Sequence, residues 1–269
     1  MLTVAITTFE RGELVCRAIR SALAFVRPLG GRVVVVDDGS PQAIFPFIQA
    51  AFKADLQGST LVHVRQDRNG GVTSGKNLAF AHSDSGWVLF LDSDDELLPE
   101  SAQEVARALT SRNHDALMFF RCVDQHGDAV GRPFDTPQQL DLVRYLAHTS
   151  YGEALVAINK AVTSTAPFDD DLRGYEGMGC ARLIDRFGPA LLMPIVARRY
   201  YRVGGDRLSS LSGMMARAKY LCRGHLRYVR LFGTRMSLLT RIKFRAKASI
   251  YFILAGLDGV FRVRNERST

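Results

Sequence analysis

The stretch Trp87-Val88-Leu89-Phe90-Leu91-Asp92-Ser93-Asp94-Asp95-Glu96 decides the fold class of this chain. Its apolar half predicts a strand buried on both faces, as in a parallel sheet covered by helices. Its acidic half follows at the carboxyl end of that strand, the edge at which open α/β sheets bind ligands. Neighbouring carboxylates repel one another, so this cluster requires a cation or hydrogen-bond donors, unless it is a solvated turn that caps the next helix. We expect a ligand site here, with the capping turn as the alternative.

On both sides of this strand, β-branched runs alternate with helical patterns, which favours βα units and a mostly parallel sheet. Three repeats precede it, with strands at 2–8, 32–37 and 60–65 and helices at 12–27, 42–56 and 73–83. A helix to about 112 and a strand at 116–121 follow it. The alternation fades over 127–154, where we expect a β-hairpin or a lid. Residues 151–203 predict a second compact segment with a helix after Glu176 and a strand at 191–201.

The composition is that of a soluble globular protein, since 47% of the 269 residues are hydrophobic and 23% are charged, which excludes disorder. The four cysteines share no close spacing, so they predict neither a disulfide framework nor a metal-binding pair; they are Cys16, Cys122, Cys180 and Cys222. The amino terminus has no signal-peptide pattern. Together these features predict the reducing cytosol.

Positive charge is concentrated at the end of the chain. The formal net charge is +8, yet residues 214–269 hold 13 Lys and Arg against 2 Asp and Glu, which leaves the rest of the chain at −3. Apolar residues recur at helical spacing among these cations, which is typical of a basic amphipathic helix on an anionic membrane surface. The run 248–261 is too short to span a bilayer, so we expect peripheral attachment. The alternatives are helices that pack on the catalytic domain or on a second subunit, and nucleic-acid binding, which no base-reading motif supports.

Polar groups also end two other predicted strands, as Thr7-Thr8-Phe9 and as Asp37-Asp38-Gly39-Ser40. These two motifs, followed by Asn69-Gly70-Gly71-Val72 with Lys76-Asn77 and by Asp92-Ser93-Asp94, resemble the nucleotide-sugar domain of glycosyltransferase family 2 over residues 1–210. The resemblance implies a GT-A, Rossmann-like α/β fold with a mostly parallel sheet flanked by helices. It also implies an inverting, metal-dependent hexosyltransferase.

The resemblance assigns the donor-binding residues. Thr8 and Phe9 would line the base pocket, and Asp38 or Asp37 would accept a hydrogen bond from the base, which suits uracil because a carboxylate is an acceptor only. Arg68 would flank the base or the α-phosphate, or is simply a surface cation. Lys76 stands where relatives often have Arg, which keeps the charge but loses bidentate phosphate contacts.

Asp92-Ser93-Asp94 looks like the family's DxD motif. By this resemblance, Asp92 reaches the ribose and Asp94 binds Mn²⁺ or Mg²⁺ with the donor diphosphate, and both carboxylates are candidate metal ligands. The cation would neutralise the leaving phosphate without a proton. Asp95 would serve the outer shell of the metal or cap the helix. The stretch that contains Arg202 and Arg207 resembles a mobile segment that closes over the diphosphate in relatives. The alternative is a plain surface loop.

The sequence leaves open which residue acts as the general base. Relatives usually supply it from a Glu-Asp pair at the start of a helix, and here that pair reads Glu176-Gly177. Glu176 is the nearest remaining carboxylate. The alternatives are Asp169, Asp170 or Asp171, or an enzyme with little or no activity, or a Glu176 that only favours the helix dipole.

These observations predict a catalytic domain over 1–212, with a nucleotide-binding half at 1–121 and an acceptor half at 122–212, and a basic helical extension at 213–269. We expect transfer of a sugar, most simply from a UDP-sugar, to a hydroxyl of a glycan or lipid-linked saccharide in surface polysaccharide synthesis, on the cytosolic membrane face. A homo-oligomer is compatible with the sequence. The competing hypothesis is a nucleotide-sugar-binding or scaffold subunit that lacks catalysis because Gly177 replaces the usual Asp.

Overall fold

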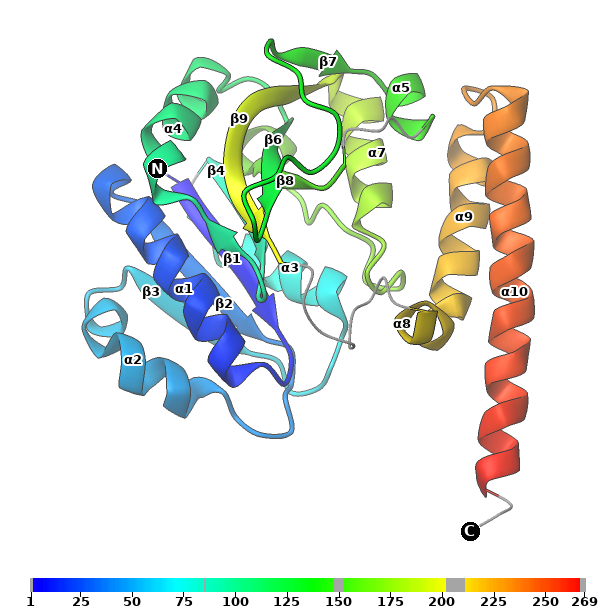
Figure 1. Ribbon diagram of the computed structural model, residues 1–269, viewed down its shortest axis with the longest axis horizontal. Helices are drawn as coiled ribbons and strands as arrows, with labels where there is room; N and C mark the ends of the chain where they lie inside the picture. Colours follow the sequence, from blue (N-terminus) through cyan, green and yellow to red (C-terminus); the bar gives the residue numbers. More distant parts are fainter. Residues whose placement is uncertain (1, 85, 148–151, 202–210, 267–269) are drawn as a thin grey trace.

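The computed structural model describes residues 2–84, 86–147, 152–201 and 211–266 of the chain. These residues form a nine-stranded curled sheet in the order β3-β2-β1-β4-β8-β6-β9-β5, with β7 added against β9 (Figure 1). The strands are β1 (Leu2–Thr8), β2 (Arg32–Asp37), β3 (Leu61–Arg65), β4 (Trp87–Asp92), β5 (Glu96–Leu97), β6 (Leu117–Asp124), β7 (Gln138–Leu140), β8 (Ala154–Asn159) and β9 (Ala190–Tyr200).

Helices cover both faces of the sheet (Figure 1). One buried cluster joins the sheet to α1 (Gly12–Val26), α2 (Phe45–Gln57) and α4 (Ala102–Ser111). The opposite cluster joins it to α3 (Val72–Ala81), α5 (Leu142–Leu146), α7 (Glu176–Phe187), α9 (Ala218–Phe232) and α10 (Leu238–Glu266). Shorter helices are α6 (Lys160–Thr163), α8 (Leu211–Ala216) and the 3-10 turns η1 (Arg27–Leu29) and η2 (Pro99–Ser101).

The predicted βα repeats are confirmed, and they place the polar strand ends next to one another. Strands β3, β2, β1 and β4 are parallel neighbours, and all four consecutive valines of β2 are buried. In the register of the sheet, Thr8 on β1 lies opposite Asp37 on β2, and Thr7 lies opposite Asp92 on β4. Since paired strands are about 4.8 Å apart, the three ends form one continuous polar edge.

In the second half of the sheet, the strands predicted at 116–121 and 191–201 are present as β6 and β9, but the rest differs from the prediction. Strand β8 was not expected, and it runs antiparallel between β4 and β6. Residues 127–147 form no complete hairpin: after an isolated bridge between Val123 and Ala129, β7 pairs with the distant β9 and α5 follows. The local pattern could not reveal this because both features depend on partners that are far away in the sequence.

Helices α9 and α10 lie side by side as a C-terminal hairpin (Figure 1). The inner side of α9 belongs to the same buried cluster as the sheet, through Tyr228 and Phe232, and α10 adds Phe244. Tyr175, just before α7, hydrogen-bonds His225 of α9 through its hydroxyl at 3.0 Å. Within the described residues, no helix combines the length and the apolar character that crossing a bilayer requires.

Candidate active site

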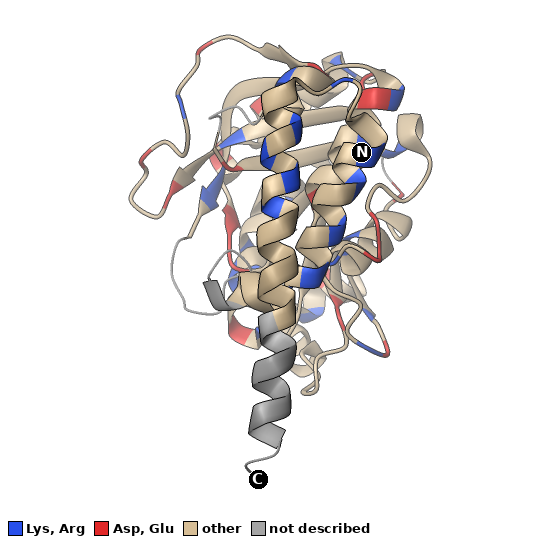
Figure 2. Cartoon of the chain, turned by 90° about the vertical axis from the view of Figure 1, so that its right-hand side faces the viewer, with Lys and Arg blue, Asp and Glu red and all other residues tan. Residues whose placement is uncertain are grey.

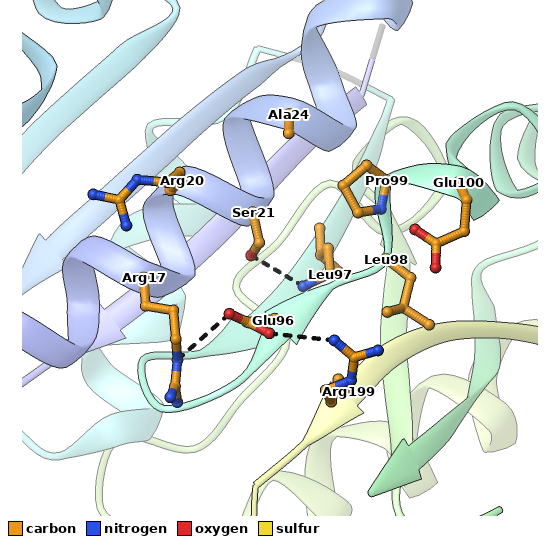
Figure 3. A pocket seen from close by; sticks show the side chains of 10 residues that line it. All are labelled: Arg17, Arg20, Ser21, Ala24, Glu96, Leu97, Leu98, Pro99, Glu100 and Arg199. Carbon is orange, nitrogen blue, oxygen red and sulfur yellow. Dashed lines mark hydrogen bonds and ion pairs between the residues drawn. The ribbon is translucent and has the colours of Figure 1, made fainter. Parts of the chain in front are cut away.

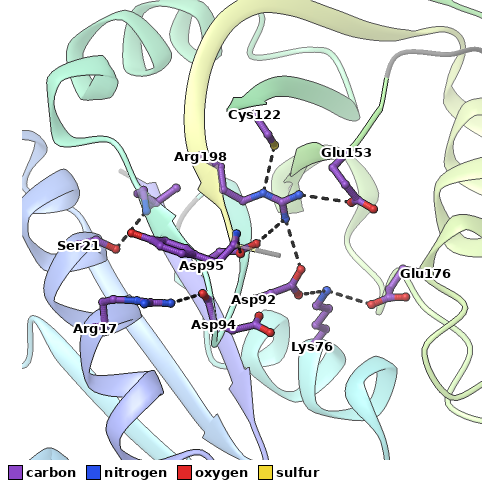
Figure 4. Close-up of polar contacts among 12 residues, drawn as sticks. Arg17, Ser21, Lys76, Asp92, Asp94, Asp95, Cys122, Glu153, Glu176 and Arg198 are labelled. Carbon is purple, nitrogen blue, oxygen red and sulfur yellow. Dashed lines mark hydrogen bonds and ion pairs between the residues drawn. The ribbon is translucent and has the colours of Figure 1, made fainter. Parts of the chain in front are cut away.

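The acidic turn at the end of β4 is compensated by cations (Figure 4). Asp92 accepts a hydrogen bond from Lys76 Nζ at 2.9 Å on Oδ1, and Oδ2 lies 3.3 Å from Arg198 Nη1. Asp94 Oδ2 accepts from Arg11 Nη1 at 2.8 Å. Burial opposes the ionisation of Asp92, but Lys76 and Arg198 outweigh it and lower its pKa. The turn is therefore an arranged ionic site and not a solvated cap.

Arg198 of β9 is the buried centre of this arrangement, with a side chain only 3% exposed. Its guanidinium lies 3.3 Å from Asp92, 3.4 Å from Asp95 and 3.4 Å from Glu153. Its Nε donates to Cys122 Sγ at 3.1 Å. Asp95 is 1% exposed, and burial raises its pKa to about 7 although Arg198 acts in the opposite direction. Asp95 accordingly faces Arg198 and the Tyr201 amide, at 3.0 Å, rather than the open side of the turn.

Lys76 connects the acidic turn to the first residue of α7. Its Nζ lies 2.9 Å from Asp92 and 3.0 Å from Glu176 Oε1. Burial alone would lower the pKa of Lys76, but the two carboxylates outweigh it and raise this pKa. Lys76 thus stays charged and holds Glu176, which is 28% exposed, at the edge of the site.

The two aspartates after β2 hold the neighbouring backbone. Asp37 is fully buried, accepts from the Ser40 amide at 2.9 Å and pairs with Arg65 at 3.1 Å. Asp38 accepts from Gln66 Nε2 at 2.7 Å and from the amides of Gly70 and Gly71 at 2.8 Å, which fixes the turn before α3. Burial raises the pKa of Asp38, and the two glycine amides oppose this shift. Both side chains therefore stabilise the backbone that follows β2 and the turn before α3.

The other expected donor-site residues lie at the same edge. Thr8 is 2% exposed and its Oγ1 has no hydrogen-bond partner among the described residues, while Phe9 is half-buried. Ser93 is buried inside the acidic turn. Arg68 is exposed, and its backbone packs on Gly39, where φ is +71° and a Cβ would lie 2.5 Å from the Arg68 carbonyl carbon. Arg202 and Arg207 lie outside the described residues.

A shallow pocket of about 280 Å³ lies behind the acidic turn, between α1, β5 and β9 (Figure 3). Several of its polar groups pair with one another: Glu96 lies 3.7 Å from both Arg17 and Arg199, and Ser21 Oγ accepts from the Leu97 amide at 3.1 Å. Arg17 also donates to the backbone oxygen of Asp94. The residues that line this pocket therefore help to hold the acidic turn in place.

The family model described as Glycosyl transferase family 2 matches residues 3–159, which is more than half of the chain. The chain belongs to glycosyltransferase family 2. A curated relative, an uncharacterised glycosyltransferase of Haemophilus influenzae, is 24% identical over 165 residues, covering 60% of this chain and 53% of the relative. The chain therefore spans about half the length of that relative.

Solved structures of S. aureus TarS confirm the GT-A-like fold of this family 2 chain. TarS 1–349 superposes with a TM-score of 0.64 at 15% identity, over 93% of this chain and 71% of the TarS chain. The same protein in complex with UDP-GlcNAc gives a TM-score of 0.63 at 16% identity, over 85% and 66% of the two chains. At such identities the likeness establishes the arrangement of the sheet and its helices, and nothing finer.

Two tyrosine hydroxyls fill the space beside Gly177, the residue that departs from the family pattern. Tyr145 of α5 donates to the Gly177 oxygen at 3.1 Å. A Cβ on Gly177 would lie 3.0 Å from the hydroxyl of Tyr228 on α9 and 3.3 Å from that of Tyr145. The C-terminal hairpin thus reaches the position at which the sequence resemblance implies the usual base.

Three other carboxylates were candidates for that role, and the structure gives each one a structural partner. Asp169 pairs with Arg182, and Asp171 pairs with Arg227 at 2.6 Å. Asp170 accepts from Asn77 Nδ2 at 2.8 Å. Among the described residues, none of these three shares a cation with the acidic turn, whereas Glu176 does so through Lys76.

A divalent cation fits this family 2 site at Asp94 better than at Asp92. Both oxygens of Asp92 already face Lys76 or Arg198, although this side chain is 40% exposed; Asp94 is 28% exposed, and only its Oδ2 pairs with a cation among the described residues, Arg11. No group of three His, Cys, Asp or Glu side chains suited to a metal occurs within the part of the chain that the structure describes. A cation at Asp94 would need oxygen ligands from a diphosphate and water, which Mg²⁺ commonly accepts.

Sequence reasoning missed Arg198, Tyr145 and Tyr228. Arg198 had a usable signal, since it is a cation inside a run that reads as a buried strand, where arginine occurs only when paired. The two tyrosines had none, because their approach to Gly177 depends on how α5 and α9 pack on α7.

Proposed function

We propose that this chain transfers a sugar, with inversion, from a nucleotide-sugar donor to a hydroxyl group of an acceptor. One observation carries the proposal: Lys76 joins Asp92 of the DxD turn to Glu176, at 2.9 and 3.0 Å, on the polar edge formed by β1, β2 and β4. A carboxylate thus lies beside the edge that, in this proposal, binds the diphosphate. The TarS neighbours solved with UDP and with UDP-GlcNAc support a UDP-sugar as the donor.

In this mechanism, Thr8, Phe9 and Asp38 or Asp37 hold the nucleoside, Arg68 flanks the base or phosphate, and Asp92 faces the ribose. Glu176 accepts the proton of the acceptor hydroxyl while the oxygen of that hydroxyl bonds to the anomeric carbon. The bond from that carbon to the phosphate oxygen breaks on the opposite face, and the electron pair leaves with the nucleoside diphosphate. Mn²⁺ or Mg²⁺ at Asp94 would supply charge neutralisation at this diphosphate, to which Arg202 and Arg207 would add positive groups.

The Glu176→Gln variant tests the base. Its amide oxygen can still accept from Lys76, so donor binding should persist, while turnover should fall by roughly 10²–10⁴, the usual contribution of a general base. The matched control is Asp170→Asn, which removes a neighbouring carboxylate that has no contact with Lys76. Undiminished turnover in Glu176→Gln, or an equal loss in Asp170→Asn, would refute the assignment.

A thermal-shift panel identifies the donor and the cation. UDP-, GDP- and dTDP-sugars are compared with and without Mn²⁺, because a ligand that binds the native state raises its apparent stability. We expect the largest shift for a UDP-sugar with Mn²⁺, and we expect Asp94→Ala to remove the part that depends on Mn²⁺. A shift that is the same in Asp94→Ala would contradict the metal site.

We further propose that the acceptor is a glycan or lipid-linked saccharide in surface polysaccharide synthesis and that the chain acts on the cytosolic membrane face. The basic hairpin supports this location. Homo-oligomerisation stays an open prediction, and nucleic acid is not expected as a partner.

A second candidate function is a subunit that binds nucleotide sugars without catalysis. Gly177 favours it, because two tyrosine hydroxyls fill the space beside the residue that usually carries the base. Donor binding with no release of nucleoside diphosphate, for any acceptor and in the presence of Mn²⁺, would select this function over transfer.

A further inference from the structure

We propose that the outer side of the C-terminal hairpin docks on a lipid bilayer that contains anionic lipid, with exposed apolar side chains entering the interface. The proposal rests on this surface alone and does not require sugar transfer. Of the large hydrophobic residues exposed in the described chain, eight belong to the hairpin; they are Leu226, Leu231, Leu238, Leu239, Ile242, Ile250, Phe252 and Ile253. Leu239 is 80% exposed and Phe252 is 73% exposed, which is costly unless something apolar covers them.

The side chains of α10 are sorted around its axis in the way an interfacial helix requires. At about 100° per residue, the six exposed apolar residues of α10 fall within an arc of about 160°. Phe244 and Ala248, which face α9, are on the opposite side and are buried. Arg241 borders the apolar arc on one side and Arg245 lies just inside that edge, while Lys243 and Lys247 lie beyond the other edge. An apolar centre flanked by cations matches a helix that lies in the plane of an anionic membrane.

Helix α9 extends the same surface. Lys219, Arg223, Leu226 and Arg230 follow one another at spacings of three or four residues, so they share the exposed side of this helix. A groove of about 340 Å³ runs between the two helices, lined by Cys222, Leu226, Ala248, Ser249, Phe252 and Ile253. All of these lining residues are apolar or small, so the groove suits hydrocarbon.

The charge of this surface selects the partner. No Asp or Glu occurs between Asp206 and Asp258, and Figure 2 shows basic residues along both helices and no acidic residue on α9 or on the part of α10 that is not grey. Arg227 and Arg235 pair with Asp171 and Asp185 of the catalytic body. No ion pair engages Arg223, Arg230, Lys243 or Arg245 within the part of the chain that the structure describes.

Two other partners fit this surface less well. A second copy docked through the same face would bring like charges together, which is unfavourable. A nucleic acid would neutralise the cations with its phosphates, but it would leave the apolar arc of α10 in water. An anionic bilayer satisfies both groups, since Lys and Arg face the headgroups and the apolar residues enter below them.

The way α9 packs on the domain determines how the domain would be oriented on the bilayer. What this orientation means for the acceptor rests on the proposed function. Helix α9 contacts the start of α7 through the Tyr175–His225 hydrogen bond, and Tyr228 lies beside Gly177. A bilayer under the hairpin would therefore lie near the side of the domain that carries Glu176. A lipid-linked acceptor could then reach this site without leaving the membrane.

Vesicle co-sedimentation of the full chain tests the surface, with phosphatidylcholine vesicles compared with vesicles that also contain phosphatidylglycerol. We expect binding to the anionic vesicles only. A charge variant, Arg230→Gln with Lys243→Gln and Arg245→Gln, should bind about 100-fold or more weakly at low salt, because each cation contributes about 1 kcal/mol and each tenfold change is about 1.4 kcal/mol. An apolar variant, Leu239→Gln with Ile242→Gln and Phe252→Gln, should weaken binding by at least tenfold even at high salt.

The matched control replaces three exposed cations in or directly after other helices of the molecule: Lys53→Gln, Arg107→Gln and Arg112→Gln. It should bind vesicles like the parent chain, and circular dichroism melts should show that all variants are folded. Equal binding to both kinds of vesicle, or equal losses in the control and charge variants, would overturn the proposal. So would tighter binding to RNA than to vesicles, or a dimer in light scattering that the apolar variant abolishes. Binding is measured without donor or acceptor, so a failure of sugar transfer would not affect this result.

Discussion

Replacing Gly177 by Ala tests whether the hairpin occupies the position of the usual base. Gly177 is the second residue of α7 and does not have a positive φ, so its backbone accepts a side chain. In a helix interior, Gly to Ala stabilises by about 1 kcal/mol, and somewhat less is expected in the first turn. Against this gain, the new Cβ would lie 3.0 Å from the Tyr228 hydroxyl, inside the 3.5–4.0 Å optimum for non-bonded atoms.

The contact and the helix propensity therefore oppose each other. We expect Gly177→Ala alone to change the free energy of unfolding by about zero or to lower it by up to about 1 kcal/mol, because Tyr228 is buried and shares a hydrogen bond with Tyr145. In a Tyr228→Phe background the obstructing oxygen is gone. There the same substitution should stabilise the chain by up to about 1 kcal/mol.

Urea unfolding of the four chains in this double-mutant cycle measures the coupling between the two positions. We expect a coupling free energy of about 1 kcal/mol, in the range found for residues in contact. The matched control is Gly188→Ala, just after α7, where no atom lies within 4 Å of an added Cβ. Gly188 has a φ of +100°, so Ala there should cost stability equally in both backgrounds. If Gly177→Ala gave its full propensity gain in the parent chain, the reasoning would be wrong.

Two further predictions concern buried groups. Arg198→Met leaves Asp95 without its buried cation, so it should lower the free energy of unfolding by about 3–5 kcal/mol, measured by urea denaturation; a loss as small as that of the surface variant Arg107→Gln would contradict the central role of Arg198. Burial lowers the pKa of His63 below 6.5, so the chain should lose stability as pH falls from 6.5 toward the folded-state pKa. His63→Phe should reduce this acid sensitivity in thermal melts because it removes the titrating ring beside Phe45, whereas the exposed control His126→Gln should not.

The sequence predicted the half of the fold that is built from βα repeats, with the parallel strands β1 to β4. Runs such as the four valines of β2 require burial on both faces, and polar residues at the end of each run must then meet at one edge. Thr8, Asp37 and Asp92 do so in the register of the sheet. Strand β8 escaped prediction because its place between β4 and β6 depends on pairing across more than 30 residues, which no local pattern encodes.

The acceptor side of the site escaped prediction for the same reason, and this connects two features that looked unrelated in the sequence. Gly177 reads as a lost carboxylate, and the basic tail reads as a separate attachment. In the structure, Tyr228 of α9 lies beside Gly177, and Phe232 and Phe244 of the hairpin belong to the core under the sheet. An acid at 177 and the hairpin in its present position would compete for one space. The hairpin therefore packs directly beside the start of α7, and under the proposed function this leaves Glu176, which Lys76 holds, as the carboxylate that would serve as the base.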